Sequence, residues 1–149
     1  TWFFDGMLSN QANPNRNPQY MVTGNGDREV VLERNRQGHY VAGGAINDVP
    51  VTFLLDTGAT DVAIPAGVAE AARLDPGNAY QAATANGVVT VYSTRVDSIT
   101  LGNIEFTDIR ASITPSMGGN TILLGMSALG EVEFTQRGTT LTLRQASGD

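Results

Sequence analysis

The stretch Val51–Thr60 constrains this chain more than any other, because an apolar strand pattern there runs directly into Asp56-Thr57-Gly58. Apolar residues occupy both faces before Asp56, which is typical of a strand buried on both sides. A carboxylate at the end of such a strand is costly unless neighbouring groups compensate it. Gly58 allows a tight turn or a close approach, and the Thr57 hydroxyl can bond to a neighbouring main chain. The combination indicates a catalytic carboxylate, and the simpler alternative is a strand that ends in an ordinary β-turn.

Length and composition narrow the function classes. The chain has 149 residues, enough for one domain with a sizeable core, and its net charge is −6. Its basic residues are scattered, so nucleic acid is not an expected partner. Cysteine is absent, which excludes a thiol nucleophile, thiolate metal sites and disulfides. No apolar run is long enough to cross a bilayer. The chain begins at Thr1 rather than Met, so we expect that a signal peptide or an anchor has been removed upstream.

The first 28 residues differ from the rest. Trp2, Phe3, Phe4 and Leu8 form an apolar cluster, and the following residues 10–17 are rich in Asn, Gln and Pro. Such a composition favours an extended or disordered linker. We therefore predict an N-terminal linker or extension over 1–28 and the folded domain over 29–149.

Short strand patterns alternate with turn signals through that domain. The predicted hairpins are Glu29–Arg34 with Gly38–Ile46, Tyr80–Ala85 with Val88–Ser93, Arg95–Leu101 with Ile104–Ile113, and Glu131–Thr135 with Thr139–Leu143. Asn47-Asp48 turns the chain into the strand that delivers Asp56, and Thr121–Leu124 forms a short apolar strand. Short helices are expected after Pro65, as far as about Leu74, and over Met126–Leu129. The pattern predicts an all-β domain with one or two short helices and no internal repeat.

Other chemistries find little support. The only histidine, His39, stands at the start of a predicted strand without a nucleophile or an orienting partner near it in sequence. Zinc would need more His or Cys ligands. Gly43-Gly44 lacks the lysine and the following helix of a phosphate loop. We expect no metal and no cofactor, which leaves chemistry by two carboxylates.

Three motifs in order carry a resemblance to a known family: Leu54–Thr60, the hairpin around Thr84–Gly87, and Ile122–Gly125. The chain from about Glu29 to Arg144 resembles the retropepsin-like aspartic proteases, particularly their bacterial membrane-anchored branch. The resemblance implies a closed β-barrel of the acid-protease fold, with one lobe per chain and an active site completed by homodimerisation. It also implies a periplasmic domain held at the inner membrane by an N-terminal anchor that this chain lacks, which would be its only membrane contact.

The same resemblance assigns roles to residues. It implies that Asp56 is catalytic, with Thr57 and Gly58 supporting it, and that 83–88 form a flap. The implied substrate-binding residues are Ala59, Thr60, Ala83, Thr84, Ala85, Asn86, Gly87, Val88, Leu123 and Leu124. One departure stands out, because viral members usually join two charged residues at the positions that Thr60 and Met126 occupy here. The usual support of the dimer interface is therefore expected to be built differently.

The number of Asp-Thr-Gly motifs in the chain leads to the same expectation of a homodimer. The chain contains one Asp-Thr-Gly, so a two-fold axis would have to bring Asp56 against its own symmetry mate. Two adjacent carboxylates share a proton, and the pair could then activate water to hydrolyse a peptide bond. The sequence thus predicts an aspartic endopeptidase whose partners are a peptide or protein substrate and a second copy. Two alternatives stay open: a non-catalytic dimeric peptide-binding module on the same fold, and a structural periplasmic domain.

Overall fold

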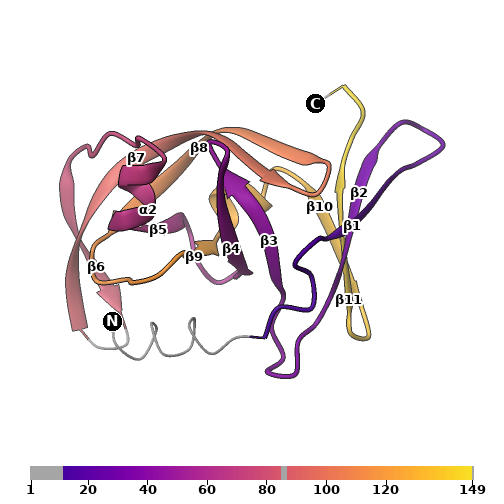
Figure 1. Cartoon of the computed structure of the whole chain (residues 1–149), viewed down its shortest axis with the longest axis horizontal. Helices are drawn as coiled ribbons and strands as arrows, with labels where there is room; N and C mark the ends of the chain where they lie inside the picture. The colour runs from indigo at the N-terminus through magenta and orange to yellow at the C-terminus, as the bar shows by residue number, and fades with distance from the viewer. Residues whose placement is uncertain (1–11, 85–86, 149) are drawn as a thin grey trace.

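Two β-sheets form the part of the chain that the computed structural model describes, residues 12–84 and 87–148 (Figure 1). The strands are β1 (Gln19–Val22), β2 (Arg28–Glu33), β3 (Val41–Ile46), β4 (Val49–Leu55), β5 (Val62–Pro65), β6 (Ala79–Thr84), β7 (Gly87–Leu101), β8 (Ile104–Thr114), β9 (Thr121–Leu124), β10 (Glu133–Arg137) and β11 (Thr140–Gln145). Two short helices, α2 (Ala66–Ala71) and α3 (Met126–Leu129), complete the described elements.

The larger sheet closes into a barrel. Its strands follow the order β3-β4-β9-β5-β8-β7-β6, and β3 pairs back onto β7 through Ala45 with Thr100 and Ile46 with Ile99. Six strands therefore make the closed wall, while β6 extends beyond it as the partner of β7 alone. Closure removes most of the free strand edges that an open sheet would expose. This mostly-β closed barrel with short helices confirms the predicted fold class.

The smaller sheet has the order β1-β2-β11-β10 and stands at one end of the barrel, at the right of Figure 1. It corrects one prediction, since β2 does not form a hairpin with β3 but pairs with β1 and β11. The Asn35 side chain explains the break, because its oxygen accepts hydrogen bonds from the backbone N–H groups of Gln37 and His39 at 3.0 and 2.8 Å. These bonds close a loop that directs the chain out of one sheet and into the other.

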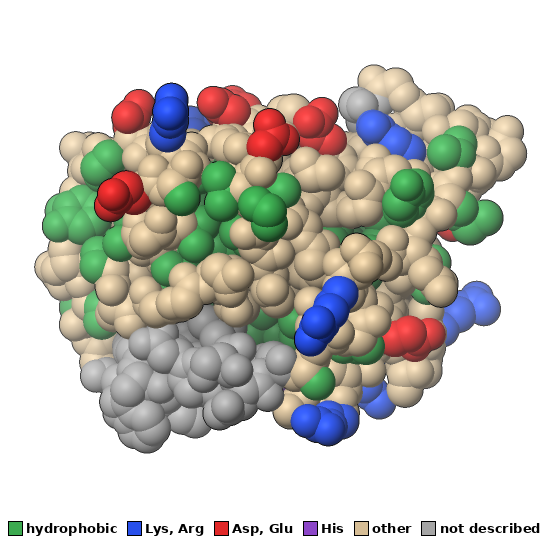
Figure 2. Space-filling model, viewed as in Figure 1, with side chains coloured by type: hydrophobic (Ala, Val, Ile, Leu, Met, Phe, Trp, Pro, Cys, Tyr) green, Lys and Arg blue, Asp and Glu red, His purple; other side chains and the backbone are tan. Residues whose placement is uncertain are grey.

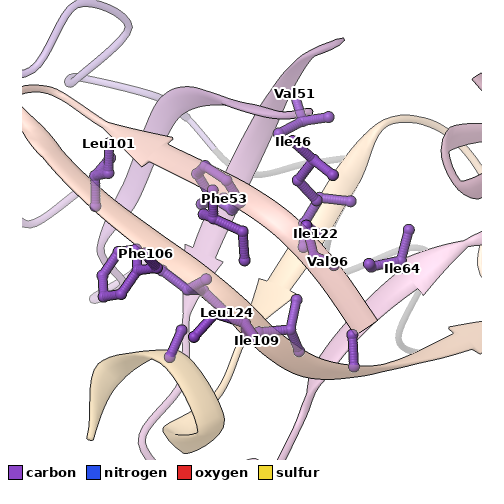
Figure 3. Close-up of a cluster of buried hydrophobic side chains, with 14 of the residues drawn as sticks. Ile46, Val51, Phe53, Ile64, Val96, Leu101, Phe106, Ile109, Ile122 and Leu124 are labelled. Atoms are coloured by element: carbon purple, nitrogen blue, oxygen red, sulfur yellow. The ribbon is translucent and has the colours of Figure 1, made fainter. Parts of the chain in front are cut away.

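Apolar side chains reach the surface in scattered places on the face shown in Figure 2, whereas the core is continuous. Phe53 and Ile122 from neighbouring strands meet Phe106 and Ile109 of β8 inside the barrel (Figure 3). Each of these four side chains is at most 2% exposed. Burying an aromatic or branched side chain contributes about 1.5–3 kcal/mol, so this cluster fixes the wall that carries the site.

Most turns lie close to their predicted places. Asn47 and Asp48 both have positive φ (45° and 68°) and join β3 to β4, as expected for a tight hairpin. The predicted strands on either side of Thr94 are instead one strand of 15 residues, β7. The sequence contains no Gly or Pro near Thr94, and the Thr94 hydroxyl donates to the carbonyl of Asp75 at 2.9 Å without interrupting the ladder.

Part of the predicted N-terminal extension packs on the domain. Gln19–Val22 forms β1, and Asn15 is 6% exposed. The Asn15 side chain donates to the carbonyls of Glu33 and Val41, each at 2.9 Å, and accepts from the Glu33 N–H. Among residues 12–84 and 87–148, no helix has the length and apolar character needed to cross a membrane.

Candidate active site

The Asp-Thr-Gly loop directly follows strand β4 in the wall of the barrel. β4 and β9 run parallel, with Leu54 opposite Leu123 and Leu55 opposite Leu124. The pairing continues beyond β4, because the Asp56 N–H donates to the Leu124 carbonyl at 3.0 Å. The backbone of Asp56 is therefore positioned by two adjacent strands, and a side chain held by rigid elements can be placed accurately.

The Asp56 carboxylate is half-buried and turned back over its own loop. Its Oδ1 accepts a hydrogen bond from the Gly58 N–H at 2.8 Å, and the Ala59 N–H donates to the Asp56 carbonyl at 3.2 Å. A Cβ at position 58 would lie 3.1 Å from Oδ1, so glycine allows the close approach that this bond requires. Thr57 is exposed beside the carboxylate. The arrangement leaves one carboxylate oxygen bonded within the loop and the group as a whole partly open to solvent.

Helix α3 holds the far side of this loop. The N–H groups of Met126 and Ser127 donate to the carbonyls of Ala59 and Thr60, both at 2.8 Å. The first N–H groups of a helix have no partner within it, and here they bind the loop. Backbone hydrogen bonds therefore join the segments around Thr60 and Met126 within one chain. That the dimer interface is supported differently from that of viral members stays a prediction.

Gly125 makes that contact possible. A Cβ there would collide with the carbonyl oxygen of Asp61 and lie 2.8 Å from that of Ala59. The segment Ile122–Gly125, the third of the motifs that carry the resemblance, therefore passes directly against the loop. Leu124 itself is fully buried in the core, and its carbonyl rather than its side chain touches the loop.

A second set of polar contacts holds the loop, and the residues that make these contacts were not predicted from the sequence. The Ser127 Oγ donates to the Arg110 carbonyl at 2.7 Å and accepts from the Val62 N–H at 3.2 Å. Arg110 also pairs with Asp61, with 2.8 Å between Nε and Oδ1. Asp61 directly follows the range singled out from the sequence, Val51–Thr60, and nothing in the sequence connects Ser127 or Arg110 to it.

A pocket of about 360 Å³ opens beside the loop. It is lined by Tyr40, Leu55, Asp56, Thr57, Leu129, Phe134, Gln136, Leu141 and Leu143. The smaller sheet supplies the last four of these, so the pocket lies between Asp56 and that sheet. The Tyr40 hydroxyl is buried without a hydrogen-bond partner in the described residues.

The predicted flap is only partly described. β6 and β7 pair antiparallel up to Ala83 opposite Val88 and Thr84 opposite Gly87. Ala85 and Asn86 lie outside the described residues. The pairing moves Gly87 from the predicted turn into the first position of β7, where its φ is +113°. A hairpin at this place is as expected, and its role as a flap stays a prediction.

The remaining predicted substrate-binding residues lie in two settings. Ala59 is half-buried and Thr60 is exposed, both on the loop. Leu123 is 5% exposed and packs with Val41, Leu54 and Met117 in a small second cluster. The loop residues are accessible to a ligand, whereas Leu123 and Leu124 mainly support the wall behind it.

A closed barrel with a single Asp-Thr-Gly loop, supported by a parallel strand pair and a short helix, is the retropepsin-like fold. The crystal structure of a retropepsin-like aspartic protease from Rickettsia conorii matches it with a TM-score of 0.65 and 25% identity, covering 85% of this chain and 94% of that one. The family model described as gag-polyprotein putative aspartyl protease matches residues 42–131. The chain belongs to this family of aspartyl proteases.

Two bacterial relatives extend the comparison. An uncharacterised protein of Sinorhizobium sp is 32% identical over 117 residues, which are 76% of this chain and 50% of that protein. An uncharacterised protein of Rickettsia prowazekii is 30% identical over 105 residues, which are 68% of this chain and 44% of that protein. The chain therefore spans about half the length of these relatives.

Proposed function

We propose that this chain is an aspartic endopeptidase that works as a homodimer, with one Asp56 from each chain in the catalytic pair. The observation that carries the proposal is the half-buried Asp56 carboxylate, held at the end of a barrel strand with its Oδ1 bonded to the Gly58 N–H at 2.8 Å. The family match over residues 42–131 supports it. Because the chain contains one Asp-Thr-Gly, the second carboxylate would come from a second copy.

The chemistry follows from two carboxylates that share one proton. Like charges a few ångströms apart do not both ionise readily, so one member of the pair carries the proton. The ionised member takes a proton from a water molecule between them, while the protonated member donates a hydrogen bond to the scissile carbonyl. The water attacks the carbonyl carbon, and no covalent enzyme intermediate forms.

The substrate would be an extended peptide lying between the Asp56 loop and the β6–β7 hairpin. Thr60 on the loop and Val88 on the hairpin are both exposed. Extended peptides bind mainly through their backbones when strand edges lie on either side. Closure of the hairpin over the peptide would exclude bulk water from the pair, which is the role we assign to residues 83–88.

Subunit mixing tests the shared pair. Asp56→Asn removes the acid and base function with almost no change in shape, so the variant should fold and should not cleave peptides. Wild-type and variant chains are mixed at constant total protein and allowed to exchange fully. If only wild-type pairs are active, activity follows the square of the wild-type fraction, and an equal mixture keeps roughly a quarter of the activity.

The outcomes separate the candidate functions. A linear decline, with exchange confirmed, would show that each chain works alone and would contradict the shared pair. Peptide binding without any turnover by the wild type would favour the non-catalytic binding module. The pH profile gives a second criterion, since only the singly protonated pair contains both an acid and a base. Activity should therefore rise and fall with pH through two ionisations that belong to the pair.

We also propose that the domain faces the periplasm, attached by an N-terminal anchor in the full-length protein. The bacterial origin of the relatives and the motif resemblance support this location. Cell fractionation of the full-length protein is the test. Recovery in the membrane fraction, with digestion of the domain by protease added to intact spheroplasts, would support the proposal, whereas protection from that protease would contradict it.

A further inference from the structure

Four arginines gather at one end of the molecule, although they are scattered in the sequence. Arg16, Arg34, Arg36 and Arg137 are all exposed, and none of them makes an ion pair with another residue of 12–84 or 87–148. We propose that this basic patch binds anionic lipid headgroups and sets one side of the domain against the membrane surface. The inference rests on the proposed N-terminal attachment and names the surface that faces the lipid.

Hydrogen bonds join the three segments that carry these arginines. The Arg34 N–H donates to the Thr139 carbonyl at 2.8 Å, which connects the loop after β2 to the β10–β11 turn. The side chain of Asn15, the neighbour of Arg16, donates to the Glu33 carbonyl at 2.9 Å. The three segments therefore present one surface, and several basic side chains lie at the lower right of the face in Figure 2.

The charge of this end is opposite to that of the rest of the chain. Segments 12–16, 33–39 and 137–140 contain four arginines and one glutamate, so their formal charge is +3. The whole chain carries −6, and the other residues therefore carry −9, the difference between −6 and +3. Exposed charges act over about 10 Å at 0.1 M salt. A molecule with this polarity turns its basic end toward an anionic surface.

The first described residue lies beside the patch. The Ala12 carbonyl accepts a hydrogen bond from the Asn35 side chain at 2.9 Å, and the Ala12 N–H donates to the Gln37 Oε1 at 3.4 Å. Both partners belong to the loop that carries Arg34 and Arg36. An anchor upstream would therefore tether the domain from the side on which these arginines lie. A basic patch next to an anchor adds a second, electrostatic contact with the lipid.

An acidic segment of a peptide substrate is the other ligand that this charge would attract. The patch borders the Asp56 pocket, because Gln136 lines that pocket and directly precedes Arg137. However, none of the four arginines lines the pocket. Arg137 stands on the opposite face of β10 from Gln136, since alternate residues of a strand point to opposite faces. The pocket therefore offers an acidic substrate no arginine to bind, which favours the lipid surface.

Vesicle binding tests the patch directly. The whole chain is mixed with vesicles that contain about one-third phosphatidylglycerol, an anionic lipid, or with vesicles of neutral phosphatidylcholine alone. The bound fraction is measured by sedimentation of the vesicles. We expect binding to the anionic vesicles to be at least about tenfold stronger at about 50 mM salt. Salt of about 0.5 M should remove the difference, because it screens the charges.

Single substitutions locate the contact. Arg36→Gln should weaken binding to the anionic vesicles about fivefold, as is typical for one basic residue near such a surface. Glu33→Gln removes the acidic residue of the patch and keeps an acceptor for the Thr140 hydroxyl, which lies 3.2 Å from Glu33 Oε2. This variant should bind more strongly by a similar factor.

Arg73→Gln is the matched control. Arg73 is also exposed and makes no ion pair within the described part of the chain, so the change in net charge is the same. It follows helix α2, which lies at the left of Figure 1, whereas the smaller sheet stands at the right. The control should bind within about twofold of the wild type, and thermal melts confirm that each variant is folded.

The proposal is overturned if the wild type binds anionic vesicles no better than neutral ones, or if Arg36→Gln and Arg73→Gln have equal effects. It is also overturned if Arg36→Gln raises the KM for an acidic peptide and leaves vesicle binding unchanged, because the patch would then contact substrate. Vesicle binding and peptide cleavage are measured separately. A chain that binds anionic vesicles through the patch and cleaves no peptide would contradict the proposed function alone. A protease indifferent to vesicles would contradict the lipid-binding patch alone.

Discussion

The loop that carries Asp56 and the hairpin formed by β6 and β7 are both exposed reversals of the chain, but they are held very differently. The loop is bonded on three sides: to β9 through Leu124, to α3 through Met126, and to its own Gly58. The hairpin depends on one ladder, because β6 has β7 as its only partner strand in the described structure. Near its tip, Val88 is 66% exposed.

The difference separates two requirements of the proposed reaction. A catalytic carboxylate must be placed to within a fraction of an ångström, and packed strands supply that accuracy. A cover over the substrate must open and close, so it is best built where few buried contacts resist movement. Substitutions in the loop should therefore reduce stability or the chemical step, whereas substitutions in the hairpin should reduce activity with little effect on stability.

Gly125→Ala should have the largest effect. The added Cβ would collide with the backbone carbonyl of Asp61, and backbone atoms held by α3 and β9 cannot move aside easily. We expect a loss of about 3 kcal/mol in the free energy of unfolding together with loss of activity. Chemical denaturation of the variant measures it. Gly67→Ala is the control, since a Cβ there meets nothing within 4 Å in helix α2, and it should stabilise by about 0.5–1 kcal/mol. Equal stability of the two variants would contradict the contact.

Gly58→Ala should act on the chemical step more than on the fold. A Cβ at this position lies 3.1 Å from the Asp56 Oδ1, so the carboxylate must shift by a few tenths of an ångström. We expect kcat to fall roughly 10- to 100-fold with a change in unfolding free energy below about 1 kcal/mol. Gly24→Ala, where a Cβ meets nothing within 4 Å, should leave kcat unchanged. Unaltered kcat in the Gly58 variant would show that this carboxylate position is not critical.

The sequence predicted the surroundings of Asp56 well because they are encoded locally. An apolar strand before Asp56, an apolar strand ending at Gly125, and the Asn47-Asp48 turn each depend on residues within one short stretch. The overall class of the fold follows from such stretches, since many short strands and few helices leave few architectures.

The features that the sequence could not predict are contacts between residues that lie far apart in the chain. β2 was expected to pair with its neighbour in the chain, but it pairs with β11, where Leu32 lies opposite Leu141. The ties from Ser127 to Arg110 and Val62 likewise join three separate segments. A lone serine or an exposed arginine has no periodicity that would reveal such a contact, so only the three-dimensional arrangement identifies it.

Gly87→Val tests the expectation that substitutions in the β6–β7 hairpin reduce activity more than stability. Gly87 has φ +113°, a conformation that a β-branched residue adopts only with strain of about 1–3 kcal/mol. The strain can be relieved by local opening at the hairpin tip, so kcat/KM should fall about three- to tenfold while the melting temperature changes little. Gly38→Val is the matched control, with φ +85° and open space for its Cβ, and it should keep full activity. Wild-type kinetics in the Gly87 variant would indicate that the hairpin is only structural.

The smallest effect is expected further along the same ribbon, where Asp108 of β8 meets Arg95 of β7 with 2.6 Å between Oδ1 and Nε. The hydrogen bond from Arg95, and then its charge, hold the pKa of Asp108 below its usual value of 3.8. A carboxyl with a lowered folded-state pKa contributes stability that is present above its unfolded value and is lost as pH falls through the folded value.

Asp108→Asn removes that charge and keeps a side chain that tolerates the positive φ of 53° at this position. The variant should melt slightly below the wild type at pH 7, within about 2 °C because exposed ion pairs contribute little. The difference should shrink as pH falls below 3.8 and vanish at the acid end, and high salt should shrink it at neutral pH. Thermal melts at matched pH and salt measure it, with peptide cleavage unchanged. A difference that grew toward acid pH would mean that the Asp108 charge destabilises the ribbon.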